Sequence, residues 1–461
     1  MKKGKNDEIL KKVLVLAIPI MIQNGITNAA GLIDNLMVGN INTEAMTAVS
    51  IAGQLIFVFN LAIFGGMSGP GIYGAQYYGN DDMEGVRNIF RLKMWIGFVC
   101  TAVGILVYIF GDKFLLGLYM KGAETGIDGE LTMNYARSYL RIMLVGLIPF
   151  TITQVYSTSL RETNESFKPM IAGIVSVVVN IFFNYVLIYG KFGAPALGVK
   201  GAAIATVICR FAECGVVVIW PHICINKHVF LQKVYKTMAV RKEIFKPVIV
   251  KSIPILLNEF LWAGGVAALS QCYSRKGLIV VASMNISNAL CNLLNVVFIA
   301  MGHAVGIIIG QYLGAGKYEE AKSKSVFLMW VTAFMCLILT GILIGISEVF
   351  PELYTSTGED VKALATKFII TTALFFPLQG FLNSLYFTLR SGGKTLVTFL
   401  FDSCFSWVVS VPCAMILCKY TNLSILPIYI IVSALDLIKV IIGFILIKKG
   451  VWISNLVKDI S

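Results

Sequence analysis

The strongest constraint on the fold is an apolar stretch near the start of the chain, residues 13–39, which reads VLVLAIPIMIQNGITNAAGLIDNLMVG. A helix of about 20 apolar residues spans the roughly 30 Å hydrocarbon layer of a bilayer, and this stretch exceeds that length. Pro19 breaks the helical hydrogen-bond ladder, which allows the helix to bend. Asp34 places a carboxylate within the span, and a charge at membrane depth is costly and by default marks an ion or substrate site.

Similar apolar stretches follow along the whole chain, separated by short polar loops. The chain has 461 residues, of which 57% are hydrophobic and 14% are charged, whereas soluble domains carry about 25% charged residues. We therefore predict an all-α, multi-pass protein of the cell membrane with no soluble domain. The expected spans cover residues 13–38, 45–75, 94–112, 135–158, 169–190, 200–223, 247–273, 278–310, 326–348, 361–388, 395–418 and 425–447.

The basic residues predict how these twelve spans are oriented. An even number of spans puts both termini on one side, and if that side is the cytoplasm, 24 of the 38 Lys and Arg residues lie in cytoplasmic tails and loops. Cytoplasmic loops of membrane proteins are enriched in Lys and Arg, so we predict that both termini are cytoplasmic. The same distribution explains the net charge of +13 without a nucleic-acid partner.

An internal repeat divides the chain into halves. Several segments recur at a constant separation of 235 residues: Ile18-Pro19-Ile20 and Ile253-Pro254-Ile255, Gln76-Tyr77 and Gln311-Tyr312, Gly79 and Gly314, and Met94-Trp95 and Met329-Trp330. Both copies begin on the same side, so we predict two six-helix bundles related by a parallel pseudo-two-fold repeat, with the binding site near mid-bilayer. The predicted parts are an N-terminal lobe at 1–223, a cytoplasmic linker at 224–246 and a C-terminal lobe at 247–461.

Polar side chains within the spans are the candidate functional residues. Asp34 either caps the outer end of its helix or forms an ion site, and we favour the ion site. Glu259, five residues after Pro254, either reaches the cytoplasmic interface or serves function, and we favour function. Asn180 and Asn184 lie four residues apart and therefore on one helix face, where they can complete a cation shell or link helices.

Other intramembrane charges have more ordinary interpretations. Arg210 with Glu213, and Asp436 with Lys439, are opposite charges three residues apart, so we interpret both as mutually neutralising structural pairs. Asp402 faces either the cytoplasm or a cavity, and the sequence does not decide between them.

The sequence does not predict a nucleotide-binding, metal-binding or catalytic site. The segment 69–74 fits G-x-G-x-x-G, and 391–395 resembles the end of a P-loop, but both follow apolar helices instead of strands. The three histidines and ten cysteines form no ligand cluster, and reduced buried thiols are the better interpretation. We therefore expect no cofactor, no nucleotide and no catalytic activity.

Several motifs of the chain together resemble those of the multidrug and toxic compound extrusion (MATE) family. They are LIDNLMVG in the first span, GAQYYGNDD after the second and GQYLGAGK after the eighth, in a chain of matching length and repeat. The resemblance implies two six-helix bundles in a V around a central cavity. It also implies export of cationic or amphipathic compounds against an inward flow of Na⁺ or H⁺.

The resemblance also implies particular site residues. The family's first-helix aspartate, which follows a helix-bending proline, matches Asp34 after Pro19, and its fifth-helix polar pair matches Asn180 and Asn184. A sixth-helix threonine matches Thr206, and the seventh-helix glutamate of one branch matches Glu259. These residues form the predicted cation-coupling set, with Na⁺ possible at Asp34, Asn180 and Asn184.

Two departures from the family pattern leave the coupling ion open between Na⁺ and H⁺. The second fifth-helix position, often aspartate in the family, is Asn184 here. The tenth helix lacks the aspartate of the Glu259 branch, and Gln379 and Asn383 are its nearest polar substitutes.

We therefore expect a monomeric cation-coupled antiporter that exports lipophilic or cationic small molecules across the cell membrane by alternating access. The alternative is a flippase of a lipid-linked saccharide in the same broad superfamily. An integral-membrane enzyme or a structural protein is a weaker alternative, because neither explains Asp34 and Glu259 within the spans.

Overall fold

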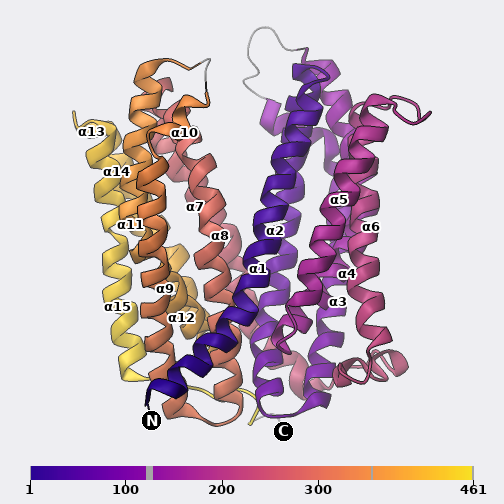
Figure 1. Ribbon diagram of the computed structural model, residues 1–461, viewed down its shortest axis with the longest axis vertical. Coiled ribbons are helices and arrows are strands. Elements are labelled where there is room, and N and C mark those ends of the chain that lie inside the picture. The colour runs from indigo at the N-terminus through magenta and orange to yellow at the C-terminus, as the bar shows by residue number, and fades with distance from the viewer. Residues whose placement is uncertain (1, 121–127, 355–356, 459–461) are drawn as a thin grey trace. The chain divides into compact units, whose positions relative to one another are not determined.

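The computed structural model describes residues 2–120, 128–354 and 357–458 (Figure 1). Within these ranges there are no strands, and twelve helical stretches are long and apolar enough to cross a membrane. The predicted all-α class with twelve spans is confirmed.

The helices follow the order expected from hydropathy. The first six spans are α1 (Lys2–Gly39), α2 (Thr43–Gly79), α3 (Met83–Met120), α4 (Gly129–Glu162), α5 (Phe167–Tyr189) and α6 (Val199–Ile223). The next four are α7 (Lys242–Ser274), α8 (Leu278–Gly314), α9 (Tyr318–Ile346) and α11 (Glu359–Ser391), with the short α10 (Val349–Glu352) before α11. The eleventh span joins α12 (Thr395–Phe399), the π-helices η3 (Leu400–Cys404) and η4 (Ser406–Ser410), and α13 (Val411–Tyr420), while the twelfth joins α14 (Ile425–Ala434) and α15 (Asp436–Lys449).

Several helices extend well beyond their apolar stretches. The third span was expected at 94–112, but α3 covers Met83–Met120. Lys93, which the sequence places in a loop, is therefore fully buried within α3, and Arg161 lies in the last turn of α4. The physical reason is that hydropathy marks only the apolar turns, whereas a helix continues through charged turns wherever those side chains find partners.

The chain folds as two units, each with its own packing. The N-unit contains Ile22–Gly74 and Met83–Lys246, and the C-unit contains Met1–Met21, Ala75–Asp82 and Pro247–Ser461. In the N-unit, α4 packs against α3 and α6, and α5 packs against α6. In the C-unit, α11 packs against α8 and α9 (Figure 1). The helix α1 contributes to both units, since its first half joins the C-unit core through Ile9, Val13, Leu16 and Ala17.

The repeated glycines mark a close helix crossing within the C-unit. A Cβ atom on Gly79 would collide with the backbone of Gln311, and a Cβ on Gly314 would collide with the backbone of Gln76. The equivalent glycines of the two repeats therefore allow the ends of α2 and α8 to touch. Gln76 strengthens this crossing, because its Nε2 donates to the carbonyl oxygen of Ser391 at 2.9 Å.

Substitution of Gly79 by alanine should destabilise the protein by about 3 kcal/mol, the top of the usual range for overpacking, because the opposing backbone cannot rotate away as a side chain can. Thermal unfolding of the purified protein in detergent would measure the loss. Gly53→Ala in the same helix is the matched control, since nothing lies within 4 Å of the added methyl group and alanine is the better helix former. Equal melting temperatures for Gly79→Ala and the wild type would contradict the crossing.

The segment 224–246 is folded against the N-unit. It contains two short 3₁₀ helices, η1 (Val229–Leu231) and η2 (Val234–Lys236). Side-chain donors on α3 bind its carbonyl oxygens: Arg87 Nε to Phe230 at 3.3 Å, Arg91 Nε to Val234 at 2.9 Å, and Trp95 Nε1 to Met238 at 2.9 Å. These bonds satisfy backbone groups that the loop itself leaves unpaired.

A histidine adds a further contact between this segment and α5. His228 is buried, and its Nε2 lies 2.8 Å from Nζ of Lys168. Burial, and then the charge of Lys168, lower the pKa of His228 from its ordinary value of 6.5. The neutral ring can accept a hydrogen bond from the ammonium group of Lys168.

Candidate cation-binding site

Asp34 of α1 and two asparagines of α5 meet inside the N-unit. Asn184 donates from Nδ2 to Oδ1 of Asp34 at 2.5 Å and to Oδ1 of Asn180 at 3.1 Å. The four-residue spacing puts the two asparagines on one face of α5, as the sequence indicates. The structure therefore brings together three of the five residues predicted to couple the cation.

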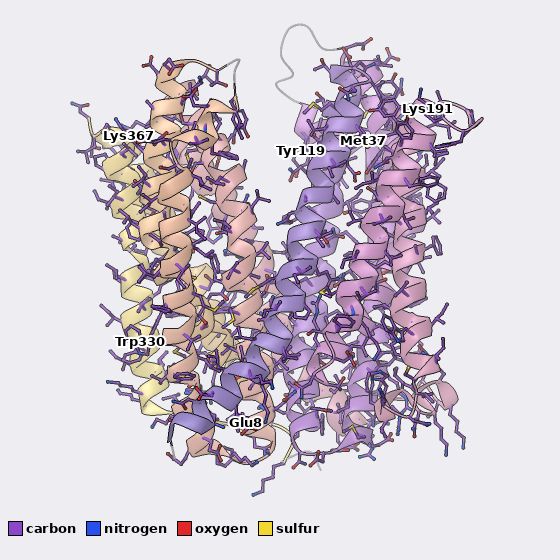
Figure 2. The ribbon with its side chains drawn as sticks, viewed as in Figure 1. Glu8, Met37, Tyr119, Lys191, Trp330 and Lys367 are labelled. Carbon is purple, nitrogen blue, oxygen red and sulfur yellow. The ribbon has the colours of Figure 1, made fainter. Side chains whose placement is uncertain are left out.

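A hydrogen bond joins the ends of α1 and α5 near this trio. The hydroxyl group of Tyr189, at the end of α5, donates to the carbonyl oxygen of Met37 at 2.8 Å. Figure 2 labels Met37 near the end of α1. This bond holds the segment that carries Asp34 against α5.

One oxygen of the trio has no partner. Asn180 and Asn184 are 4% and 1% exposed, whereas Asp34 is partly accessible. Oδ1 of Asn184 is buried and accepts no hydrogen bond from any described residue, although an unsatisfied buried acceptor costs about 1–3 kcal/mol. The trio thus presents a carboxylate and an unpaired carbonyl oxygen.

This donor set suits a proton or an alkali cation. A proton needs only the Asp34 carboxylate, while Na⁺ also needs neutral oxygens, of which Asn184 Oδ1 is one. Across the described parts of the chain, His, Cys, Asp and Glu form no group of three or more that would hold a metal ion. The expected Na⁺ set is of a different kind, one carboxylate with two carboxamides.

Tyr139 of α4 is a site neighbour that sequence reasoning missed. Its side chain is 8% exposed and interacts with both Asp34 and Thr206. Thr206 itself donates to the carbonyl oxygen of Ala202 at 3.0 Å, one turn back in α6. A tyrosine in an apolar span carries no sequence signal of its own, and only the packing of α4 against α6 places it here.

The remaining predicted residues lie in the C-unit. Pro19 lies inside α1, which remains helical on both sides of it. The part of α1 that belongs to the C-unit ends two residues later, at Met21. Glu259 of α7 accepts a hydrogen bond from Nη1 of Arg390 at 3.4 Å. The coupling role of Glu259 and the bending role of Pro19 stay predictions.

The two charge pairs expected to be structural differ from each other. Asp436 and Lys439 form the expected ion pair at 3.1 Å. Arg210 and Glu213 form no direct salt bridge, but the two opposite charges still interact through space, so their mutual neutralisation stays an interpretation. The guanidinium group of Arg210 instead donates to the carbonyl oxygen of Gly146 at 3.3 Å and lies over the ring of Phe150 at 4.9 Å, both on the neighbouring helix α4.

Gln379 and Asn383, the polar residues that stand nearest to the missing aspartate of the tenth span, differ in their hydrogen bonding. Gln379 donates from Nε2 to Oδ2 of Asp436 at 2.7 Å. Asn383 has a buried Oδ1 without a hydrogen-bond partner among the described residues.

Comparison with known proteins supports the family resemblance. A family model described as MatE matches residues 19–186 and 254–416. A relative from Thermotoga maritima, named probable multidrug resistance protein NorM, is 25% identical over 98% of this chain and 94% of its own length. Another from Bacillus subtilis, named probable multidrug resistance protein YoeA, is 26% identical over 93% of this chain and 91% of its own length.

Solved structures show the same fold. An outward-facing multidrug resistance MATE family transporter of the MOP superfamily has a TM-score of 0.84 at 18% identity, with 95% of each chain covered. A MATE crystal structure in the bent conformation has a TM-score of 0.83 at 19% identity, covering 96% of this chain and 95% of the other.

Proposed function

Because the chain belongs to the MatE family, we propose that it is a cation-coupled antiporter that exports lipophilic or cationic small molecules across the cell membrane. The family match confirms the resemblance predicted from LIDNLMVG and the paired motifs. The names of the relatives from T. maritima and B. subtilis support multidrug export. In this proposal the protein is a multi-pass monomer with cytoplasmic termini, and its coupling ion is Na⁺ or H⁺.

The observation that carries the proposal is the Asp34 trio in the N-unit. A carboxylate that accepts a hydrogen bond from a buried carboxamide, beside a carbonyl oxygen without a partner, is an arrangement that a small cation completes. A purely structural carboxylate in a membrane protein is normally neutralised by a basic partner, and Asp34 has an asparagine instead.

Coupling follows from the cost of burying charge. In the outward-facing state Asp34 binds the ion, which removes most of the penalty for enclosing the carboxylate. That changes the relative stability of the outward-facing and inward-facing conformers, so the ion selects one of them. Pro19 eases bending of α1 because its amide makes no ladder hydrogen bond. In the inward-facing state the ion leaves and the exported compound loads.

Reconstitution in liposomes tests the proposal and identifies the ion. The purified protein, the fluorescent lipophilic cation ethidium and either a proton gradient alone or a sodium gradient alone should give gradient-driven ethidium movement with one of the two ions. Liposomes without protein set the background. Ethidium movement equal to that background under both gradients, and under both together, would overturn cation-coupled export of lipophilic cations.

A further inference from the structure

The C-unit contains a second aspartate–asparagine contact, which centres on Asp402. Asp402 lies in the π-helix η3, and its Oδ2 accepts a hydrogen bond from Nδ2 of Asn258 at 3.2 Å. Asn258 is 3% exposed and its orientation is fixed, because its Oδ1 accepts from Oγ of Ser403 at 2.7 Å. The side chain of Asp402 therefore points toward α7 within the C-unit.

Charged neighbours surround Asp402 from three elements. On α7 and α11, Glu259 pairs with Arg390 at 3.4 Å, and Arg390 also donates to the hydroxyl group of Tyr386 at 3.3 Å. That hydroxyl group accepts from Asn258 at 3.1 Å, which links this pair to Asp402.

On α15, Lys439 forms ion pairs with two carboxylates. Its Nζ lies 3.1 Å from Oδ1 of Asp436 and 3.8 Å from Oδ1 of Asp402. Asp436 also accepts from Gln379 at 2.7 Å, so Asp436 is the better-satisfied partner of the lysine.

This network has one more carboxylate than it has cations. Among the described residues, Glu259, Asp402 and Asp436 form ion pairs with two basic side chains, those of Arg390 and Lys439. Glu259 and Asp436 each have the closer basic group, so the uncompensated charge falls on Asp402. An uncompensated carboxylate within a span is costly unless a cation joins it.

Asp402 is also the most exposed of the three carboxylates. Its side chain is 24% exposed, compared with 12% for Glu259 and 19% for Asp436. Two successive π-helices, η3 and η4, interrupt the eleventh span at this point, and such interruptions occur frequently at functional sites.

We propose that Asp402, held by Asn258, is a second cation-coupling carboxylate that binds H⁺ or Na⁺ in the C-unit separately from Asp34. The inference rests on the proposed antiport function and adds a second ion site to it. The contact repeats the chemistry of the N-unit, where a buried asparagine also donates to an aspartate. Lys439 acts here as a tethered cation that competes with the incoming ion.

Ion binding to the full-length protein in lipid nanodiscs tests this without any transported compound. Radioactive Na⁺ binding measures one ion, and infrared difference spectra of protonated carboxyl groups measure the other. Asp402→Asn should remove the part of the bound-Na⁺ or protonated-carboxyl signal that comes from the C-unit site. Asp34→Asn should remove the part that comes from the N-unit site. The matched control is Asp112→Asn, because Asp112 is buried but pairs with Arg137 at 2.8 Å and Arg141 at 3.3 Å; its ion-binding signal should match the wild type.

Lys439→Gln distinguishes an ion site from a structural contact. Removing a positive charge 3.8 Å from the carboxylate should tighten ion binding at Asp402 by at least about tenfold, an effect that a purely structural role would not produce. An Asp402→Asn variant with the full wild-type signal for both ions would overturn the inference. If that variant does not fold, unchanged ion affinity in Lys439→Gln overturns it. A full signal in Asp34→Asn would instead count against the proposed function.

Discussion

Asp34→Asn should strongly reduce ion-driven export while binding of the exported compound persists. The substitution keeps the size of the side chain but removes the charge that an incoming cation neutralises. Asn184, which donates to Asp34 at 2.5 Å, would then face a neutral group that no longer holds an ion. We expect the rate of gradient-driven ethidium movement in liposomes to fall on the order of 100-fold. This factor corresponds to the upper part of the usual range of coupling free energies between two sites.

The same chemical change elsewhere provides the control for Asp34→Asn. Asp81 is exposed and has φ 57°, and asparagine tolerates this left-handed conformation well. Asp81→Asn should therefore transport as the wild type does. Equilibrium binding of ethidium to the purified variants separates lost coupling from lost binding. If Asp34→Asn exports ethidium at the wild-type rate under the same gradient, the coupling role of Asp34 is refuted.

The sequence was sufficient for the class of fold because bilayer insertion requires long apolar helices. All twelve spans were recognised from hydropathy alone. The helix ends were not, since their charged residues look like loop residues until their partners are known. Lys93 illustrates this, because only the packing of α4 against α3 shows the carboxylate that it meets.

The candidate site was predictable in part. The four-residue spacing of Asn180 and Asn184 indicated one helix face, but their contact with Asp34 depends on how α1 lies against α5. Tyr139 was invisible because its position near Thr206 arises from tertiary packing. The direct contacts of Arg210 were unpredictable for a similar reason, since its guanidinium group meets a backbone carbonyl and an aromatic ring of α4 that only tertiary packing brings close.

The repeat predicts a shared scaffold but not shared chemistry. At a separation of 235 residues, the counterpart of Asp34 is Leu269 and the counterpart of Glu259 is Asn24. Lys93 has Leu328 as its counterpart, and Leu328 is fully buried in the apolar core of the C-unit. One scaffold position therefore holds a leucine in one half and a buried ammonium group in the other.

That ammonium group is the centre of a buried polar cluster in the N-unit. Nζ of Lys93 lies 2.6 and 2.7 Å from the two carboxylate oxygens of Glu162, and it also donates to Thr158 at 3.2 Å and Ser159 at 3.3 Å. The glycines 71 and 74 of α2 lie so close to Glu162 that a Cβ on either would collide with its carboxylate. The side chains of Lys93 and Glu162 are 0% and 7% exposed, so solvent screens the attraction between their charges little.

Lys93→Met should therefore destabilise the protein by about 3–5 kcal/mol, because it removes the cation that contacts both carboxylate oxygens of the buried Glu162. Adding Glu162→Gln removes the buried negative charge that has lost its closest cation, so the double variant should be more stable than Lys93→Met alone. Thermal or chemical unfolding of the wild type, both single variants and the double variant in detergent gives the coupling free energy of the pair. The exposed pair of Glu8 and Lys12, 2.7 Å apart, supplies the control, and Lys12→Met should change stability little because solvent screens that pair. If the losses of the two single variants simply add in the double variant, Lys93 and Glu162 do not stabilise the protein as a pair. In that case Lys93 in the N-unit would only fill space, as Leu328 does in the C-unit.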